Sequence, residues 1–157
     1  MGMEFRYLAI RMLLGILLSS GVATAQPDNS NTQIGMFNVT YFQASGTPHS
    51  LYGIIIVNWT TAADVPATWC ETRPAGSPSF PTTGKTACAG NPTMSFSVGR
   101  MGDGSADLEL WYEPPSAPSR YGIHHTSQDE ISVIPGLTPT GDVEVYGGPL
   151  SFTVDST

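Results

Sequence analysis

Short segments in which hydrophobic and polar residues alternate dominate the pattern along this chain. In residues 33–42, Phe37, Val39 and Tyr41 alternate with polar residues. Neighbouring side chains of a strand point to opposite faces, so this period of two is typical of a half-buried strand. We therefore predict a first strand with Phe37, Val39 and Tyr41 on its buried face.

A hairpin is the clearest pattern in the chain. Met94, Phe96 and Val98 alternate with polar residues, the turn residues 102–104 follow, and alternation resumes over residues 106–112. Other short strands are expected at residues 50–59, 68–72, 120–126, 130–134, 142–146 and 150–154. Repeated short strands separated by Gly- and Pro-rich turns predict an all-β fold, a single antiparallel β-barrel or β-sandwich of about 8–10 short strands.

The N-terminal segment predicts export from the cell. Arg6 and Arg11 lie in a stretch that precedes a short apolar run at residues 12–18, and the segment ends in small residues at Ala23 and Ala25. This order is typical of a secretory signal peptide, here residues 1–25. Residues 26–32 are polar and expected to be a flexible N-terminus, and residues 33–157 the single β domain. The predicted location is extracellular.

Charge narrows the classes of partner. Only 12% of the residues are charged, and six basic residues face thirteen acidic ones, for a net charge of -7. Nucleic-acid binding depends on a basic surface that releases counterions, so no nucleic-acid partner is expected. After residue 25 no apolar run reaches the roughly 18 residues typical of a membrane span, and no membrane insertion is expected.

Two cysteines remain after the predicted cleavage. Cys70 and Cys88 are expected to form one disulfide in an oxidising compartment. A loop of this length is stabilised by roughly 3 kcal/mol in the chain-entropy model. Asn38 and Asn58 each begin an Asn-x-Thr sequon and are predicted N-glycosylation sites.

Three residues of one predicted strand, Asp107, Glu109 and Trp111, share its outward face. Carboxylates at alternate positions lie roughly 7 Å apart, a spacing found in glycosidases, but a wet outer face would not raise the pKa of an acid catalyst. Trp111 could stack on a sugar or on a partner protein, unless the loop of residues 113–119 covers it.

A second candidate for recognition is Phe80, within the Pro- and Gly-rich segment between the cysteines. A tethered loop presents a side chain at low entropic cost, although Phe80 could equally tuck into the barrel end. The adjacent His124 and His125 point to opposite faces of a strand and cannot share a metal. We therefore expect no catalytic residue, no metal site and no cofactor.

The order of features resembles that of the secreted fungal family typified by the major Alternaria allergen. The matching segments are an aromatic first strand at 37–42, a second strand at 50–57, Cys70 in 68–71, and Cys88 in 88–97 before a Gly/Asp turn. The family's second disulfide and its intersubunit cysteine are absent, so the resemblance implies no covalent dimer. It implies a small non-enzymatic β-barrel protein of a fungus, sensed by or acting on a host.

These observations predict a secreted, non-enzymatic effector or elicitor that binds a host component, either a plant protein or a cell-wall glycan. The first alternative is an extracellular carbohydrate-binding module built around Trp111 and the acidic strand. The second is a small secreted hydrolase, which would need a cleft that joins a nucleophile or a carboxylate pair to a base.

Overall fold

The structure, a computed structural model, describes residues 35–48, 50–62, 65–76, 79–138 and 141–157. The predicted signal peptide and flexible N-terminus lie outside these ranges. The described residues form ten strands and one short 3₁₀ helix: β1 Gly35–Ser45, β2 Ile54–Thr60, β3 Thr68–Thr72, β4 Thr83–Cys88, β5 Asn91–Arg100, β6 Ala106–Tyr112, β7 Arg120–Thr126, η1 Gln128–Glu130, β8 Ile131–Thr138, β9 Gly141–Tyr146 and β10 Phe152–Ser156. In this part of the chain no helix has the length and hydropathy needed to span a bilayer.

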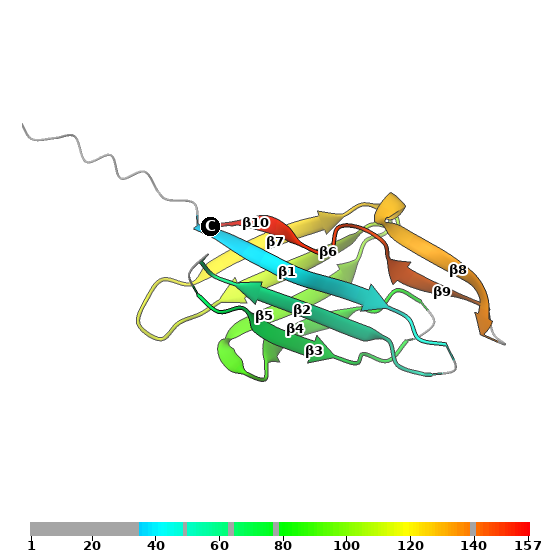
Figure 1. The fold of residues 1–157 in the computed structure, drawn as a ribbon, viewed down its shortest axis with the longest axis horizontal. Coiled ribbons are helices and arrows are strands. Elements are labelled where there is room, and N and C mark those ends of the chain that lie inside the picture. Colours follow the sequence, from blue (N-terminus) through cyan, green and yellow to red (C-terminus); the bar gives the residue numbers. More distant parts are fainter. Residues whose placement is uncertain (1–34, 49, 63–64, 77–78, 139–140) are drawn as a thin grey trace, which may run out of the picture. The chain divides into compact units, whose positions relative to one another are not determined.

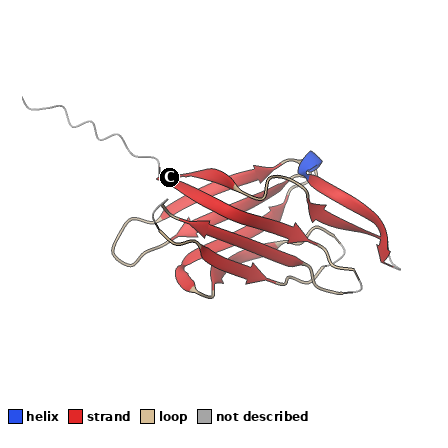
Figure 2. Cartoon of the chain, in the orientation of Figure 1, coloured by secondary structure: helices blue, strands red, loops and turns tan. Residues whose placement is uncertain are grey.

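The strands form one antiparallel sheet that curls into a nearly closed barrel (Figures 1 and 2). Its eight-strand path runs β3-β2-β1-β10-β7-β6-β5-β4, and the β8–β9 hairpin joins it where Val145 pairs with Ser45 of β1. The predicted all-β fold is confirmed, and of its two architectures the barrel is the one observed. The ends of this path, β3 and β4, are the strands that carry the two cysteines.

The disulfide joins these two end strands. Cys70 of β3 and Cys88 of β4 are bonded, with their Cα atoms 4.7 Å apart, and both side chains are buried. The sheet path includes no ladder between β3 and β4, so the covalent bond lies where hydrogen bonding of the barrel stops. The predicted pairing is confirmed, and the bond links the two ends of the strand path.

Large apolar side chains fill the barrel interior. Phe37, Phe42, Trp59 and Phe96 are all fully buried, and the Phe37 and Trp59 rings meet edge to face with centroids 4.9 Å apart. Side chains of this size fill the inside of a small barrel. The interior is therefore a packed core that holds the strands in register.

The first strand differs from its predicted pattern at one point. Its register with β2 shifts between Val39 and Tyr41, which places Tyr41 opposite Asn58 on the outer face and turns Phe42 inward. The prediction that Tyr41 shares the buried face with Phe37 and Val39 is therefore wrong. An extra residue in one strand of a pair produces this reversal.

The segment between the cysteines also differs from expectation, because it includes β4. Cys88 is the only buried residue of β4, so the strand lacks the apolar alternation by which the other strands are recognised. Strands β3, β6 and β7 begin and end at the predicted residues. The tight turn of residues 102–104 joins β5 to β6 as predicted.

Candidate functional site

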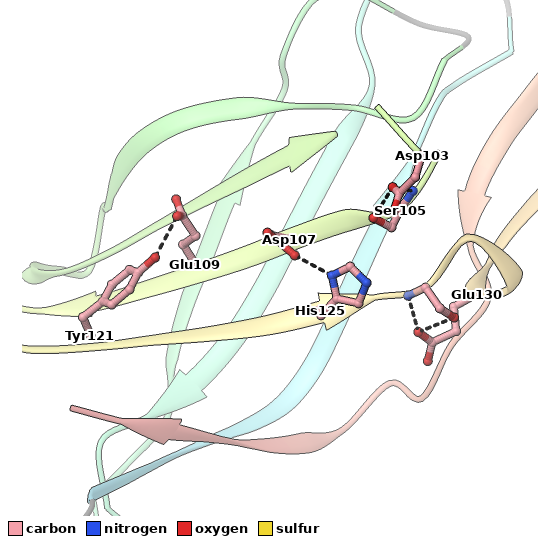
Figure 3. Close-up of polar contacts among 8 residues, drawn as sticks. Asp103, Ser105, Asp107, Glu109, Tyr121, His125 and Glu130 are labelled. Carbon is pink, nitrogen blue, oxygen red and sulfur yellow. Dashed lines mark hydrogen bonds and ion pairs between the residues drawn. The ribbon is translucent and has the colours of Figure 1, made fainter. Parts of the chain in front are cut away.

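The predicted candidates on β6, Asp107, Glu109 and Trp111, lie on the outer face of the barrel. Together with their neighbours on the adjacent strands they form a region that we call the acidic face: Ser97 of β5, Asp107, Glu109 and Trp111 of β6, and Tyr121 and His125 of β7. Each is brought there by strand alternation, since the residues between them on β6, such as Leu108 and Leu110, are buried. Figure 3 shows that the β6 carboxylates reach across to side chains of β7.

Glu109 is the most fully bonded carboxylate of this face. One of its oxygens accepts a hydrogen bond from the Ser97 hydroxyl at 2.5 Å. The other accepts one from the Tyr121 hydroxyl at 2.8 Å, which Figure 3 shows. Burial raises the pKa of Tyr121 to about 12, and the Glu109 carboxylate adds to the effect by binding the protonated phenol. Glu109 thus has a structural role that ties three strands together.

Asp107 pairs with His125 on the same face. The Asp107 Oδ1 and His125 Nδ1 atoms are 2.8 Å apart, and the imidazole remains largely exposed (Figure 3). Solvent-exposed pairs of this kind stabilise a protein by at most about 1 kcal/mol. Asp103 is separate from this pair, because it bonds the Ser105 hydroxyl and backbone N–H, and these hydrogen bonds lower the pKa of the Asp103 carboxyl.

Trp111 is half-buried on the acidic face. The Lys85 ammonium lies 5.0 Å from the centre of its ring, and the Tyr121 ring contacts it with centroids 5.3 Å apart. Lys85 is in turn held by both carboxylate oxygens of Glu113, at 2.7 and 2.8 Å. A lysine from β4 therefore covers Trp111, where the loop of residues 113–119 was the expected cover.

Phe80 lies in the core, with 5% of its surface exposed. Its backbone N–H donates to Glu144 at 2.6 Å, and the Arg100 guanidinium lies 5.4 Å from its ring centre while also pairing with Glu144 at 3.2 Å. The sequence leaves open whether Phe80 is a presented side chain or a ring tucked into the barrel end, and in the structure the ring is buried. Its side chain is therefore not available as part of a recognition surface.

The two adjacent histidines point to opposite faces, as the alternation predicts. His124 faces inward and stacks on Phe152 with ring centroids 3.7 Å apart, whereas His125 faces outward. In the described part of the chain, no group of three or more His, Cys, Asp or Glu side chains is arranged to hold a metal ion. The chemistry that the acidic face offers is hydrogen bonding by paired, outward-facing groups.

A pair of aromatic rings on another part of the outer surface was missed by sequence reasoning. Tyr41 of β1 and Trp69 of β3 stack nearly parallel, with centroids 5.9 Å apart and planes inclined by 13°. Trp69 is 52% exposed, the most open of the three tryptophans. The outward position of Trp69 could have been predicted, since the inward disulfide at Cys70 forces its neighbour outward. The outward position of Tyr41 could not, because the register shift in β1 cannot be read from the sequence.

The predicted glycosylation residues lie on the strands beside this pair. Asn38 of β1 and Asn58 of β2 are both partly exposed. Asn58 is paired in register with Tyr41 on one side and with Trp69 on the other, so it lies between the two rings. Whether either asparagine carries a glycan stays a prediction.

Comparisons with known proteins support the fold. No protein-family model and no curated protein sequence matches this chain. Among solved structures, the crystal structure of the Alternaria alternata major allergen Alt a 1 is similar, with a TM-score of 0.51 and 15% identity. The match covers 78% of this chain and 92% of that chain. At this identity, the similarity establishes a shared barrel fold.

Proposed function

We propose that this protein is a secreted, non-enzymatic effector or elicitor of a fungus, which binds a host plant component at its outer surface. The observation that carries the proposal is the similarity to the Alternaria alternata major allergen, which extends over most of both chains. A shared fold does not by itself transfer an activity, so the site must support the proposal.

The placement of the polar groups supports a binding role. The barrel interior is filled by apolar side chains, and the carboxylates of the acidic face point outward, each with a hydrogen-bond partner. Asp107 and Glu109 lie among hydroxyl, imidazole and phenol groups that are hydrogen-bonded to them, an arrangement that suits recognition.

The disulfide and the N-terminal segment support an extracellular site of action. Disulfides persist in oxidising compartments and are rare in the cytosol. The bond between Cys70 and Cys88 is buried and closes the barrel, so it serves the folded structure. Together with the signal-peptide pattern of residues 1–25, the disulfide supports a site of action outside the cell.

Leaf infiltration of the purified, oxidised chain from residue 26 onward tests the proposal. We expect a dose-dependent oxidative burst or local cell death, because a folded elicitor is sensed from the extracellular space. The matched control is the same protein at the same concentration after reduction and alkylation of Cys70 and Cys88 and heat denaturation, with its unfolding checked by circular dichroism. Absence of any response to the folded protein, or an equal response to the unfolded protein, would count against an elicitor role.

A carbohydrate-binding role is a second candidate, and a specific observation favours it. An exposed tryptophan stacked on a tyrosine is present, but at Trp69 and Tyr41, whereas Trp111 is covered by Lys85. The role first considered for Trp111 is therefore better served by another part of the barrel.

A further inference from the structure

We propose that the outer face of β1, β2 and β3 around Tyr41 and Trp69 binds a neutral, β-linked glycan with glucose-type rings. The inference extends beyond an elicitor role, because glycan binding in solution requires no plant response. It commits to one ligand class, whose sugar rings have equatorial hydroxyls and therefore apolar C–H faces.

The geometry of the two rings is the first argument. They belong to strands separated by β2, and they approach each other across Asn58. The offset stack, with centroids 5.9 Å apart, fixes the Trp69 indole against the phenol while half of its surface stays open to solvent. A rigid, exposed aromatic ring offers large contact area at low entropic cost.

The orientation of Tyr41 is held by a further contact. Its hydroxyl donates to the Gln43 side-chain oxygen at 2.7 Å, two residues along β1. Gln43 is paired in register with Ile56 of β2, and Ile56 is paired in turn with Glu71 of β3. The rings are thus preorganised before a ligand arrives, and preorganisation lowers the cost of binding.

An unpartnered polar atom at the same place is the second argument. The side-chain oxygen of Asn58 is closed to solvent, and none of the described residues donates a hydrogen bond to it. A buried acceptor without a donor is destabilising, and sugar hydroxyls are donors. Because the Asn58 residue is itself partly exposed, a turn of its amide group presents this oxygen to a hydroxyl of a sugar stacked on the indole while the two rings stay in place.

Charge favours a neutral ligand over an anionic one. The charged groups beside the rings are Glu71 and Arg73, which pair with each other at 3.1 Å. The whole chain carries a net charge of -7, so it repels acidic polysaccharides at long range. A neutral glycan is not repelled by this charge, and its hydroxyls can bond with the amides of Gln43 and Asn58.

Titration calorimetry with soluble hexasaccharides tests the site. The probes are cellohexaose, laminarihexaose and chitohexaose, and the protein is the oxidised chain from residue 26 onward, produced without N-glycans so that Asn58 is unmodified. We expect at least one probe to bind, and Trp69→Ala to weaken its affinity by about tenfold or more. The matched control is Trp111→Ala, the same change at the covered tryptophan, which should leave the affinity unchanged.

A second variant and a spectroscopic measurement keep the test independent of folding. Tyr41→Phe retains the ring and loses only the hydrogen bond to Gln43, so it should bind with a smaller loss than Trp69→Ala. The wild-type tryptophan fluorescence should shift on binding, and this shift should disappear in Trp69→Ala. Thermal unfolding curves identify any variant that does not fold.

Three outcomes would overturn the proposal. The first is that none of the three probes binds at concentrations up to about 10 mM, where even a weak site is populated. The second is that Trp111→Ala weakens binding as much as Trp69→Ala does. The third is that Trp69→Ala abolishes a plant response while no probe binds, which would assign these rings to a host protein.

Discussion

At the scale of single residues, His124 is a titratable side chain whose surroundings oppose its charged form. It lies on the inward side of β7, stacked on Phe152, and its Nε2 atom has no hydrogen-bond partner among the described residues. Burial lowers the pKa of His124 below its ordinary value, with a smaller effect of the same sign from His125, while Glu130 and Asp107 oppose the shift.

This environment predicts a dependence of stability on pH. The unfolded chain binds a proton at His124 at higher pH than the folded chain does, so stability falls as the pH is lowered through about 6.5, the ordinary histidine pKa. Urea unfolding between pH 7.5 and 5 should show this loss, and His124→Gln should reduce it. An equal slope in wild type and His124→Gln would contradict the assignment.

At the scale of elements, β7 and β10 approach each other closely at a glycine. A Cβ atom on Gly122 would lie 2.7 Å from the Asp155 carbonyl oxygen and 2.9 Å from Val154 Cγ1. These distances are too short for an ordinary contact, and the backbone oxygen cannot move without disturbing the strand. The absence of a side chain at Gly122 therefore lets the two strands pair.

Gly122→Ala should accordingly destabilise the barrel by about 1–3 kcal/mol, the usual cost of overpacking, which exceeds the entropic gain of about 0.4–1 kcal/mol from replacing glycine. Gly84→Ala is the matched control in β4, since nothing lies within 4 Å of its added Cβ. Chemical denaturation of both variants measures the difference. Equal stabilities of the two variants would show that the strands adjust more freely than the structure indicates.

The covalent closure of the barrel gives a second prediction for its elements. Removing the bond with Cys70→Ala/Cys88→Ala should cost about 3 kcal/mol, since the cysteines are 18 residues apart. Hydrogen exchange should then accelerate most in β3 and β4, the end strands of the sheet, and least in β6 and β7, which are paired on both sides. Uniform acceleration in all strands would indicate that the disulfide does not act at the closure.

Local patterns predict the elements of this protein better than they predict its surface. Strand β6 follows from alternation, because Ala106, Leu108 and Leu110 are buried and the residues between them are only partly buried. Strand β4 could not be found this way, since Cys88 is its only buried residue and the strand shows no apolar alternation. The stacking of Tyr41 on Trp69 depends on a register shift and on three paired strands, which are non-local properties.

At the scale of the whole molecule, the barrel has two outer regions of different character. The acidic face has its charged groups paired across β5, β6 and β7, and its tryptophan is covered. The region around Tyr41 and Trp69 instead exposes an aromatic ring beside amides, and its one ion pair is exposed. Because apolar side chains fill the interior, we assign the proposed recognition to the outer surface.

The most direct test of this account compares the dose dependence of the leaf response for three folded proteins. If recognition takes place at the outer surface around Tyr41 and Trp69, wild type and Trp111→Ala should elicit the response at the same dose. Trp69→Ala should then require about ten times more protein, matching its loss of glycan affinity. An identical dose dependence for all three proteins, or no response to any of them, would contradict the account.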